Sequence, residues 1–494
     1  MTHVLALDQG TTGSTALVVA ADGTVAGRGY RAITQRYPRP GWVEHDAGEL
    51  FASSVAAARE AIAEAGQKPV ALGITNQRET LVVWERATGA PVGPAIVWQD
   101  RRTAERCRAL AAEGERIAAR TGLVIDPYFT ATKLEWRLAN EPALRQRADS
   151  GDLCAGTVDS WIIWRLTNGA TFATDPTNAS RTMLYDIDRG AWSDELLATF
   201  GVPRAMLAEV RSSSGSFGET AAEHLGMTLP ILGVAGDQQA ALYGQGCWEA
   251  GEGKNTYGTG AFLLLNTGAR RPTPGAGLLT TVACDARGGA CYALEASIFV
   301  AGAAIQWLRD ELGVLESSEE SEALARGLDS NDGVYFVPAL SGLGAPDWEP
   351  RARGTIVGLT RGSSRAHLAR AALEAMAYAT RDVFTLMREH ASWAAASDAP
   401  LRVDGGVARN DWLMQFQADV LGVPVERPDV VETTALGAAG LAGIAAGVWS
   451  GPSEFLAARH TSVFEPKSHA GMELAWSGWR RAVRAALAWA ADPD

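Results

Sequence analysis

Three short glycine-rich segments have the composition of phosphate-binding turns. They are DQGTTGST at 8–15, TYGTG at 256–260 and DGG at 404–406, and each follows an apolar run. Glycine allows backbone N–H groups to approach phosphate oxygens closely, and threonine hydroxyls add further donors. Each segment taken alone is more often an ordinary turn, and the sequence contains no G-x-x-x-x-G-K-[ST] loop. Three such turns at wide separations nevertheless favour a site for nucleotide phosphates.

A second group of residues has the chemistry to bind a small polyol. Arg78 and Glu79 follow an apolar strand; adjacent opposite charges there are usually a solvated loop pair, but they can also bond neighbouring hydroxyls. Trp98, Tyr128 and Phe262 are core aromatics by default, and beside such a pair they could wall the hydrocarbon side of a small triol. Because spacing alone does not bring these residues together, both interpretations stay open.

Length, charge and cysteine usage narrow the function classes. A chain of 494 residues is too long for one hydrophobic core, so we expect two domains. The net charge is −13 with no dense Lys/Arg run, which argues against nucleic acid and anionic membrane as partners. The N-terminus resembles neither a signal peptide nor a membrane span. Five scattered cysteines disfavour zinc and disulfides, and we expect a cytoplasmic protein.

The elements that must position these residues come in two similar sets. The first set is predicted as strands at 3–9, 15–20 and 24–30, a helix at 47–65 and a strand at 70–75. The second begins with strands at 230–235, within 254–266 and at 292–295, followed by a helix at 301–312. Later segments are predicted as a helix at 364–390, a strand at 401–403, a helix at 410–421, a strand at 423–427 and a helix from Thr433.

This duplication predicts two α/β domains with a ligand cleft between them. In each set an acidic residue, Asp8 or Asp237, ends an early strand and a Gly/Thr turn follows close behind. Ligands usually bind between such halves. We place the boundary near residue 230, shortly after the small polar run SSSGSFG at 212–218.

The chain resembles the FGGY carbohydrate kinases over essentially its whole length, and among them the members that phosphorylate glycerol. The segments that carry the resemblance are ALDQGTT (6–12), PGWVEHD (40–46), GITNQRET (73–80), AIVWQDRRTAE (95–105), GLVIDPYF (122–129), NASRTML (178–184), GVAGDQQAAL (233–242), NTYGTGAF (255–262), FVAGAAIQWLRD (299–310), GLGAPDW (342–348) and ETTALGAA (432–439).

The resemblance implies a fold and a set of site residues. The fold is a pair of actin-like, ribonuclease-H-like α/β domains: 1–229 with the glycerol side and first phosphate turn, and 230–494 with the catalytic aspartate and adenosine side. The glycerol contacts would be Arg78, Glu79, Trp98, Tyr128, Asp237, Gln238 and Phe262. The ATP contacts would be Thr11, Thr12, Gly13, Thr259, Gly302, Gln306, Gly406 and Asn410.

Asp237 and Asp8 are the expected catalytic residues. By the same resemblance both carboxylates would lie at Mg²⁺, and Asp237 would take the proton of the attacking hydroxyl. The chain is expected to form homodimers or homotetramers. Two departures from the family pattern stand out: Thr15 occupies a commonly basic position, and Arg137 an apolar one. Thr15 puts nucleotide affinity in question more than activity.

Three alternatives remain open on the sequence. The nearest is an FGGY kinase acting on another small polyol or a ketose. An actin-like or heat-shock-like ATPase would share the nucleotide turns but has no reason to carry Arg78 and Glu79 with the three aromatics. A catalytically silent binding module is the weakest, since every expected reactive group is present.

Overall fold

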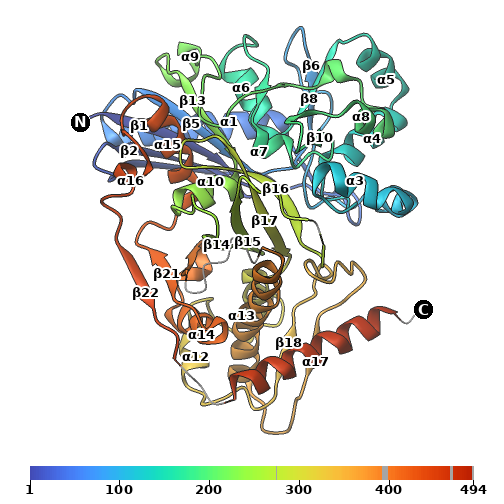
Figure 1. The fold of residues 1–494 in the computed structure, drawn as a ribbon, viewed down its shortest axis with the longest axis vertical. Helices are drawn as coiled ribbons and strands as arrows, with labels where there is room; N and C mark the ends of the chain where they lie inside the picture. Colours follow the sequence, from blue (N-terminus) through green and yellow to red (C-terminus); the bar gives the residue numbers. More distant parts are fainter. Residues whose placement is uncertain (274, 392–398, 468–470, 492–494) are drawn as a thin grey trace.

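Two β-sheets, one in each half of the molecule, organise the chain (Figure 1). The computed structural model describes residues 1–273, 275–391, 399–467 and 471–491. The first sheet has the strand order β13-β5-β1-β2-β3, with β1 at His3–Gln9, β2 at Gly13–Ala20, β3 at Val25–Ala32, β5 at Ala71–Asn76 and β13 at Ile231–Gly236. Strands β1, β2 and β3 are antiparallel, whereas β5 and β13 extend the sheet in parallel.

The first sheet is covered on both faces by helices that are distant in sequence. Alternate side chains of β1 point to opposite faces, as strand geometry requires. Leu5 and Leu7 belong to the core under α1 (Ala47–Ala65), whereas Val4 and Ala6 pack with α15 (Thr433–Ala445). A side chain at Gly73 of β5 would collide with the backbone of α15, so glycine is needed for this close approach.

The second sheet repeats the topology of the first. Its order is β16-β17-β15-β14-β20-β21-β22, with β14 at Gly253–Tyr257, β15 at Ala261–Gly268, β16 at Leu279–Cys284, β17 at Ala290–Ile298, β20 at Leu401–Asp404, β21 at Val425–Pro428 and β22 at Thr461–Phe464. Three antiparallel strands that are neighbours in the sheet, β14, β15 and β17, correspond to β1, β2 and β3, and the parallel strands β20 and β21 correspond to β5 and β13. The predicted duplicated α/β architecture is confirmed.

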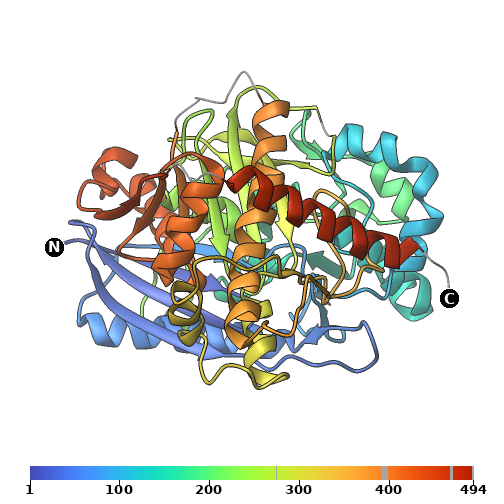
Figure 2. The same ribbon diagram turned by 90° about the horizontal axis from the view of Figure 1, so that it is seen from below.

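Helices of the later chain pack around the second sheet. They are α11 (Gly302–Asp310), α12 (Glu320–Arg326), α13 (Arg365–His390), α14 (Asp411–Leu421) and α17 (Met472–Ala491). Figure 2 shows α17 lying across α13 on the lower side of the molecule. Its residues Trp479, Ala482 and Val483 join the same core as Met376 and Val383 of α13.

The stretch between β5 and β13 adds further helices and short strands to the first half, and much of it lies to the right in Figure 1. Its helices are α2 (Ala104–Ala109), α3 (Gly114–Thr121), α4 (Thr130–Asn140), α5 (Pro142–Asp149), α6 (Val158–Leu166), α7 (Pro176–Ala179), α8 (Asp194–Phe200) and α9 (Ala222–Leu225). Short strands in this stretch, together with β4 from before β5, form pairs: β4 (Glu44–His45) with β7 (Ala95–Ile96), β6 (Val82–Glu85) with β8 (Leu153–Gly156), β9 (Ala173–Thr174) with β12 (Glu209–Val210) and β10 (Tyr185–Asp186) with β11 (Ala191–Trp192).

Two further features concern the division of the chain and the membrane. Strand β13 lies just beyond the boundary predicted near residue 230 but hydrogen-bonds to β5, so chain on both sides of that point contributes to the first sheet. The boundary itself stays a prediction. Among the described residues, no helix combines the length and apolar character needed to span a bilayer.

Candidate active site

The first phosphate-turn candidate connects β1 to β2. The Gly10 N–H donates to the Gly13 carbonyl at 2.9 Å and closes the turn, while Thr12 is exposed and Thr11 partly so. Gly13 begins β2, where an added Cβ would lie 2.6 Å from the Tyr30 hydroxyl oxygen. The turn therefore presents its backbone and hydroxyl groups outward without bulky side chains.

Asp8 lies near the end of β1, beside this turn. Its strand partners are Thr15 on β2 and Thr75 on β5. Burial raises the pKa of the Asp8 carboxyl to about 7, and the negative charge of Asp237 adds to the increase. The two predicted catalytic carboxylates, which are far apart in the sequence, thus lie close enough to repel one another.

Arg78 is the centre of a buried ionic network just after β5. Its guanidinium donates to both carboxylate oxygens of Glu295 on β17, at 2.7 and 2.9 Å. It also donates to Gln239 at 3.2 Å and to the Tyr128 hydroxyl at 3.4 Å. Its Nε lies 3.0 Å from Asp237 Oδ1, an ion-pair contact outside hydrogen-bond geometry. Arg78 therefore joins the two sheets and lies directly against the predicted base.

Glu79 and Arg181 complete this network. Glu79 adopts a positive φ of 61°, and its Oε1 accepts from Arg181 Nε at 2.6 Å. Arg181 also donates to Glu295 at 3.0 Å, and its guanidinium lies 5.4 Å from the ring centroid of Tyr128. Two guanidiniums and two carboxylates thus balance in charge within a region closed to water, as buried ions require.

The two glutamates of this network have different protonation tendencies. Burial on its own would raise the pKa of Glu295, but Arg181 and Arg78 lower it to about 2. For Glu79, burial outweighs the attraction of Arg78 and Arg181 and raises the pKa above its ordinary value. Glu295 is therefore a fixed anion that anchors the guanidiniums, while Glu79 is the more readily protonated acceptor.

Aromatic side chains form a wall that extends from Arg78 to the first turn. The rings of Trp98 and Tyr128 meet edge to face with centroids 5.6 Å apart, and Trp98 and Phe262 do so at 6.1 Å. Trp98 Nε1 donates to the Thr11 hydroxyl at 2.9 Å, which links the wall to the first phosphate turn. The structure thus brings together the three aromatics that the sequence left as either core or site residues.

Gln238 follows Asp237 at the start of α10 (Asp237–Gly244) and accepts a hydrogen bond from Lys254 of β14. Lys254 Nζ donates to Gln238 Oε1, to the Thr256 hydroxyl at 2.7 Å and to the Phe262 carbonyl at 3.2 Å. Burial lowers the pKa of Lys254 to about 8, although Asp404 opposes this effect. This lysine connects the predicted polyol side to the strand that leads into the second turn.

The second phosphate-turn candidate, between β14 and β15, packs against the start of α11. The Gly302 N–H donates to Gly258 O at 3.0 Å, and the Ala301 N–H donates to Thr259 O at 2.8 Å. An added Cβ at Gly302 would lie 2.6 Å from Gly258 O. Gly405, at φ 85°, is pressed against the backbone of Tyr257. The turn at 256–260, the α11 terminus and the DGG turn therefore meet.

The remaining predicted nucleotide contacts lie around this meeting point. Gly406 begins a short 3-10 helix, Gly406–Arg409, directly after Gly405. Asn410 follows it and caps α14 by accepting from the Leu413 N–H at 2.9 Å. Gln306 is exposed on α11, one turn after Gly302. Their roles toward a nucleotide stay predictions.

Three charged residues of the site were missed by reasoning from the residue pattern. Arg181, Glu295 and Lys254 are all buried, and no local pattern marks a charged residue as belonging to an internal network. Arg181 and Glu295 form their contacts with residues more than a hundred positions away. The only available signal was that Arg181 lies within the segment NASRTML at 178–184.

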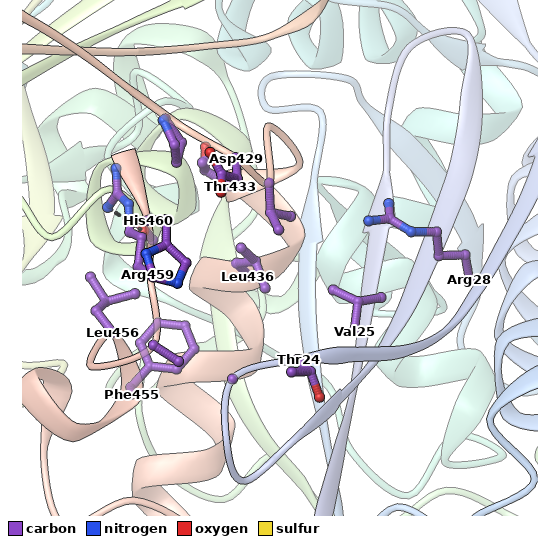
Figure 3. Close-up of a pocket in the computed structure, with 15 residues that line it drawn as sticks. Thr24, Val25, Arg28, Asp429, Thr433, Leu436, Phe455, Leu456, Arg459 and His460 are labelled. Carbon is purple, nitrogen blue, oxygen red and sulfur yellow. Dashed lines mark hydrogen bonds between the residues drawn. The ribbon is translucent and has the colours of Figure 1, made fainter. Parts of the chain in front are cut away.

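A separate cavity of about 360 Å³ lies away from these residues (Figure 3). Its walls come from the β2–β3 turn, the start of α15 and the segment leading into β22, including Thr24, Thr433, Phe455 and His460. None of the predicted site residues lines it. Among the described residues, no cluster of three or more His, Cys, Asp or Glu side chains could hold a metal ion.

Comparisons with known proteins agree with this arrangement. Residues 3–244 match the FGGY family of carbohydrate kinases, N-terminal domain, and residues 253–446 match its C-terminal domain. Glycerol kinase from Thermus brockianus is 54% identical over 99% of both chains, and glycerol kinase from Halorhodospira halophila is 52% identical over 100% of this chain and 98% of its own. The crystal structure of Plasmodium falciparum glycerol kinase with ADP matches with a TM-score of 0.90 and 34% identity, covering 99% of this chain and 98% of that one. Xylulose kinase from Rhodospirillum rubrum has a TM-score of 0.86 at 24% identity over 99% of this chain and all of its own, which shows the shared fold.

Proposed function

Because the chain belongs to the FGGY family of carbohydrate kinases, we propose that it is an ATP:glycerol 3-phosphotransferase, which forms glycerol 3-phosphate and ADP. The observation that supports glycerol most directly is the convergence of Arg78, Glu79 and Asp237 beside an edge-to-face aromatic wall. A small triol needs both donors and acceptors on one side and a hydrocarbon surface on the other, and this site offers both.

In this proposal glycerol reaches the site from the side that is open to solvent. Asp237 retains 28% side-chain exposure, and Trp98 and Phe262 are partly exposed, whereas Arg78 and Glu79 are buried behind them. Buried groups that lack partners cost about 1–3 kcal/mol each, so an analogue missing one hydroxyl leaves part of the site unpaired. Selectivity therefore rests on the polar groups, and the aromatic wall supplies shape.

Asp237 is the base of the reaction. In phosphoryl transfer the protein mainly positions groups and stabilises charge, because the transition state is loose. An alcohol is far less acidic than a carboxylic acid, so the proton moves to Asp237 late, once the hydroxyl oxygen is bonding to phosphorus. The positive charge of Arg78, whose Nε lies 3.0 Å from Asp237 Oδ1, attracts that carboxylate and keeps it beside the polyol site. Before proton transfer, Asp237 aims the substrate oxygen.

The nucleotide lies between the two glycine-rich turns in this proposal. Thr11, Thr12 and Gly13 approach the phosphates from the first half, and Thr259 from the second. Gly302, Gln306, Gly406 and Asn410 surround the adenosine side. Glycine is required at Gly13 and at Gly302, because an added Cβ would collide with Tyr30 at the first and with the Gly258 carbonyl at the second.

The carboxylates present fit a magnesium ion that arrives with the nucleotide. Mg²⁺ usually keeps several waters and binds one or two carboxylates plus substrate phosphates, so a pair such as Asp8 and Asp237 suffices without a third protein ligand. The proximity of Asp237 contributes to the raised pKa of Asp8, and a cation there would relieve that repulsion. When bound, Mg²⁺ neutralises phosphate charge.

A substrate panel tests the proposal. Purified enzyme with MgATP is assayed for ADP release with glycerol, four-carbon polyols and ketoses, and the phosphorylated product is identified by mass spectrometry. Glycerol should give the highest kcat/KM. A higher value with another polyol or a ketose would move the assignment to that substrate, and ADP release that no acceptor stimulates would refute kinase activity.

We further propose that the enzyme is cytoplasmic and forms homodimers or homotetramers. Light scattering of the purified protein tests the oligomeric state.

A further inference from the structure

A buried lysine, Lys254, donates hydrogen bonds to two residues of the predicted polyol site. Lys254 on β14 has no exposed surface, and its ammonium donates to three oxygens: Gln238 Oε1, the Thr256 hydroxyl and the Phe262 carbonyl. An ammonium has three N–H donors and no acceptor, so these three bonds satisfy it completely. Two of the three acceptors belong to predicted glycerol contacts, and Thr256 begins the second phosphate turn.

The composition of the chain marks this lysine as unusual. Only four of the 44 basic residues are lysines, at 68, 133, 254 and 467. Lys133 and Lys254 are fully buried. Arginine carries a planar, rigid fork of donors, whereas lysine carries a compact ammonium that can point its donors at three separate acceptors. In a chain that otherwise uses arginine, position 254 has the residue that its three acceptors demand.

The contact with Lys254 determines which end of the Gln238 amide faces it. Because an ammonium can only donate, the amide must offer its carbonyl oxygen, and the Nε2 group is directed elsewhere. Gln238 is 6% exposed and follows Asp237, the base of the proposed function. We propose that Lys254 is a positioning residue that holds Gln238 as a hydrogen-bond donor to a glycerol oxygen. This inference rests on the proposed function.

The donor polarity of Gln238 complements the carboxylates around it. Asp237 and Glu79 can only accept hydrogen bonds when ionised. A glycerol oxygen that accepts from Gln238 keeps its own proton free for one of these carboxylates, which fixes the direction of the hydroxyl. If the amide turned over, its carbonyl would compete with the carboxylates for the same proton. The ammonium removes that second arrangement.

A double-mutant cycle tests whether Lys254 acts through Gln238. The KM for glycerol and kcat are measured for Lys254→Met, Gln238→Ala and the double variant. Each single change should raise the KM for glycerol about tenfold or more, with a smaller effect on kcat. The double variant should resemble Gln238→Ala, since the lysine has nothing left to orient. Fold-changes that simply multiply would overturn the inference.

Lys133→Met is the matched control. This second buried lysine donates to the backbone carbonyls of Tyr128 and Phe129 and makes no contact with Gln238. Its effect on the KM for glycerol should be the same in the wild-type and Gln238→Ala backgrounds. A coupling to Gln238 as large as that of Lys254 would show that loss of any buried lysine has this effect, and would reject the specific role.

Gln238→Glu covers the case in which Lys254→Met does not fold. A carboxylate at this position still accepts from Lys254 but has no N–H for the substrate, so the KM for glycerol should rise about tenfold or more while Tm holds or increases. A wild-type KM in this variant would overturn the donor role. Wild-type enzyme without glycerol-dependent ADP release would instead refute the proposed function.

Discussion

Replacing Glu295 by glutamine perturbs the buried network at its anchor. The carboxylate of Glu295 accepts three hydrogen bonds from guanidiniums, two from Arg78 at 2.7 and 2.9 Å and one from Arg181 at 3.0 Å. Hydrogen bonds to charged groups contribute about 1.5–3 kcal/mol each. Glutamine retains one acceptor oxygen, turns an N–H group toward the guanidiniums and removes the balancing charge. Breaking a buried ion pair in this way costs about 3–5 kcal/mol.

Part of that cost should appear in substrate binding, because Arg78 connects Glu295 to Asp237. Differential scanning fluorimetry should show a Tm lower by several degrees. Coupled ADP release should show a KM for glycerol raised about tenfold, equivalent to about 1.4 kcal/mol. The matched control is Glu374→Gln, since Glu374 is also buried and accepts from Arg370 at 2.7 Å within α13, away from the site. That variant should leave the KM for glycerol unchanged. If Glu295→Gln keeps both Tm and KM at wild-type values, the anchoring argument is wrong.

Three other substitutions test separate parts of the argument. Asp237→Asn should lower kcat about 100-fold or more with little change in Tm, because the base is lost while Arg78 keeps Glu295; near-normal turnover would remove the base assignment. Thr15→Arg should lower the KM for ATP, because it adds a cation opposite Asp8. An unchanged KM would show that Thr15 does not cost the enzyme a phosphate contact. Asp159→Asn tests pH linkage: burial, helped by Asp175, raises the pKa of Asp159 to about 7. Between about pH 4 and 7 the folded wild type therefore holds a proton on Asp159 that the unfolded chain has released. As pH rises through that window, the free energy of unfolding of the wild type falls by up to about 4 kcal/mol. The Tm of the asparagine variant should consequently gain on the wild type between pH 5 and pH 7.5, and parallel curves would contradict the linkage.

Local sequence pattern predicted the scaffold of the site well. The strand at His3–Gln9 and the helix at Ala47–Ala65 have the predicted bounds, because alternation and helical periodicity depend on neighbouring residues only. The turn at 256–260 and the strand reaching Asp404 were likewise found from apolar runs followed by glycines. Their meeting could not be derived from pattern, since it depends on the parallel pairing of β14 with β20 across 140 or more residues.

The ionic network illustrates what remained beyond such reasoning. Glu295 lies on a predicted strand, but its contact with Arg78 depends on where β17 passes the end of β5 in space. The same holds for Arg181, whose partners come from separate segments. A buried charge is stabilised only by the complete set of its partners, so no single segment carries the signal. Local pattern places Lys254 only as a polar residue at the start of a predicted strand, and its three acceptors cannot be found from that pattern.

Helix α15 determines how the chain can be divided into structural parts. It follows β21 of the second sheet, yet its alanines cover Val4, Ala6, Leu17 and Val19 of the first. The rigid bodies are therefore not consecutive pieces of sequence, and a fragment ending at residue 229 would leave that apolar surface bare. Three connectors link the parts of the chain that pack with the two sheets: 245–252 between α10 and β14, 429–432 before α15, and 456–460 after α16 (Pro452–Phe455). Any movement of one sheet relative to the other would have to be accommodated in all three. The connectors 429–432 and 456–460 both contribute to the walls of the cavity in Figure 3, so a fluorophore placed there would detect any change in the spacing of the two sheets without contacting the predicted site residues.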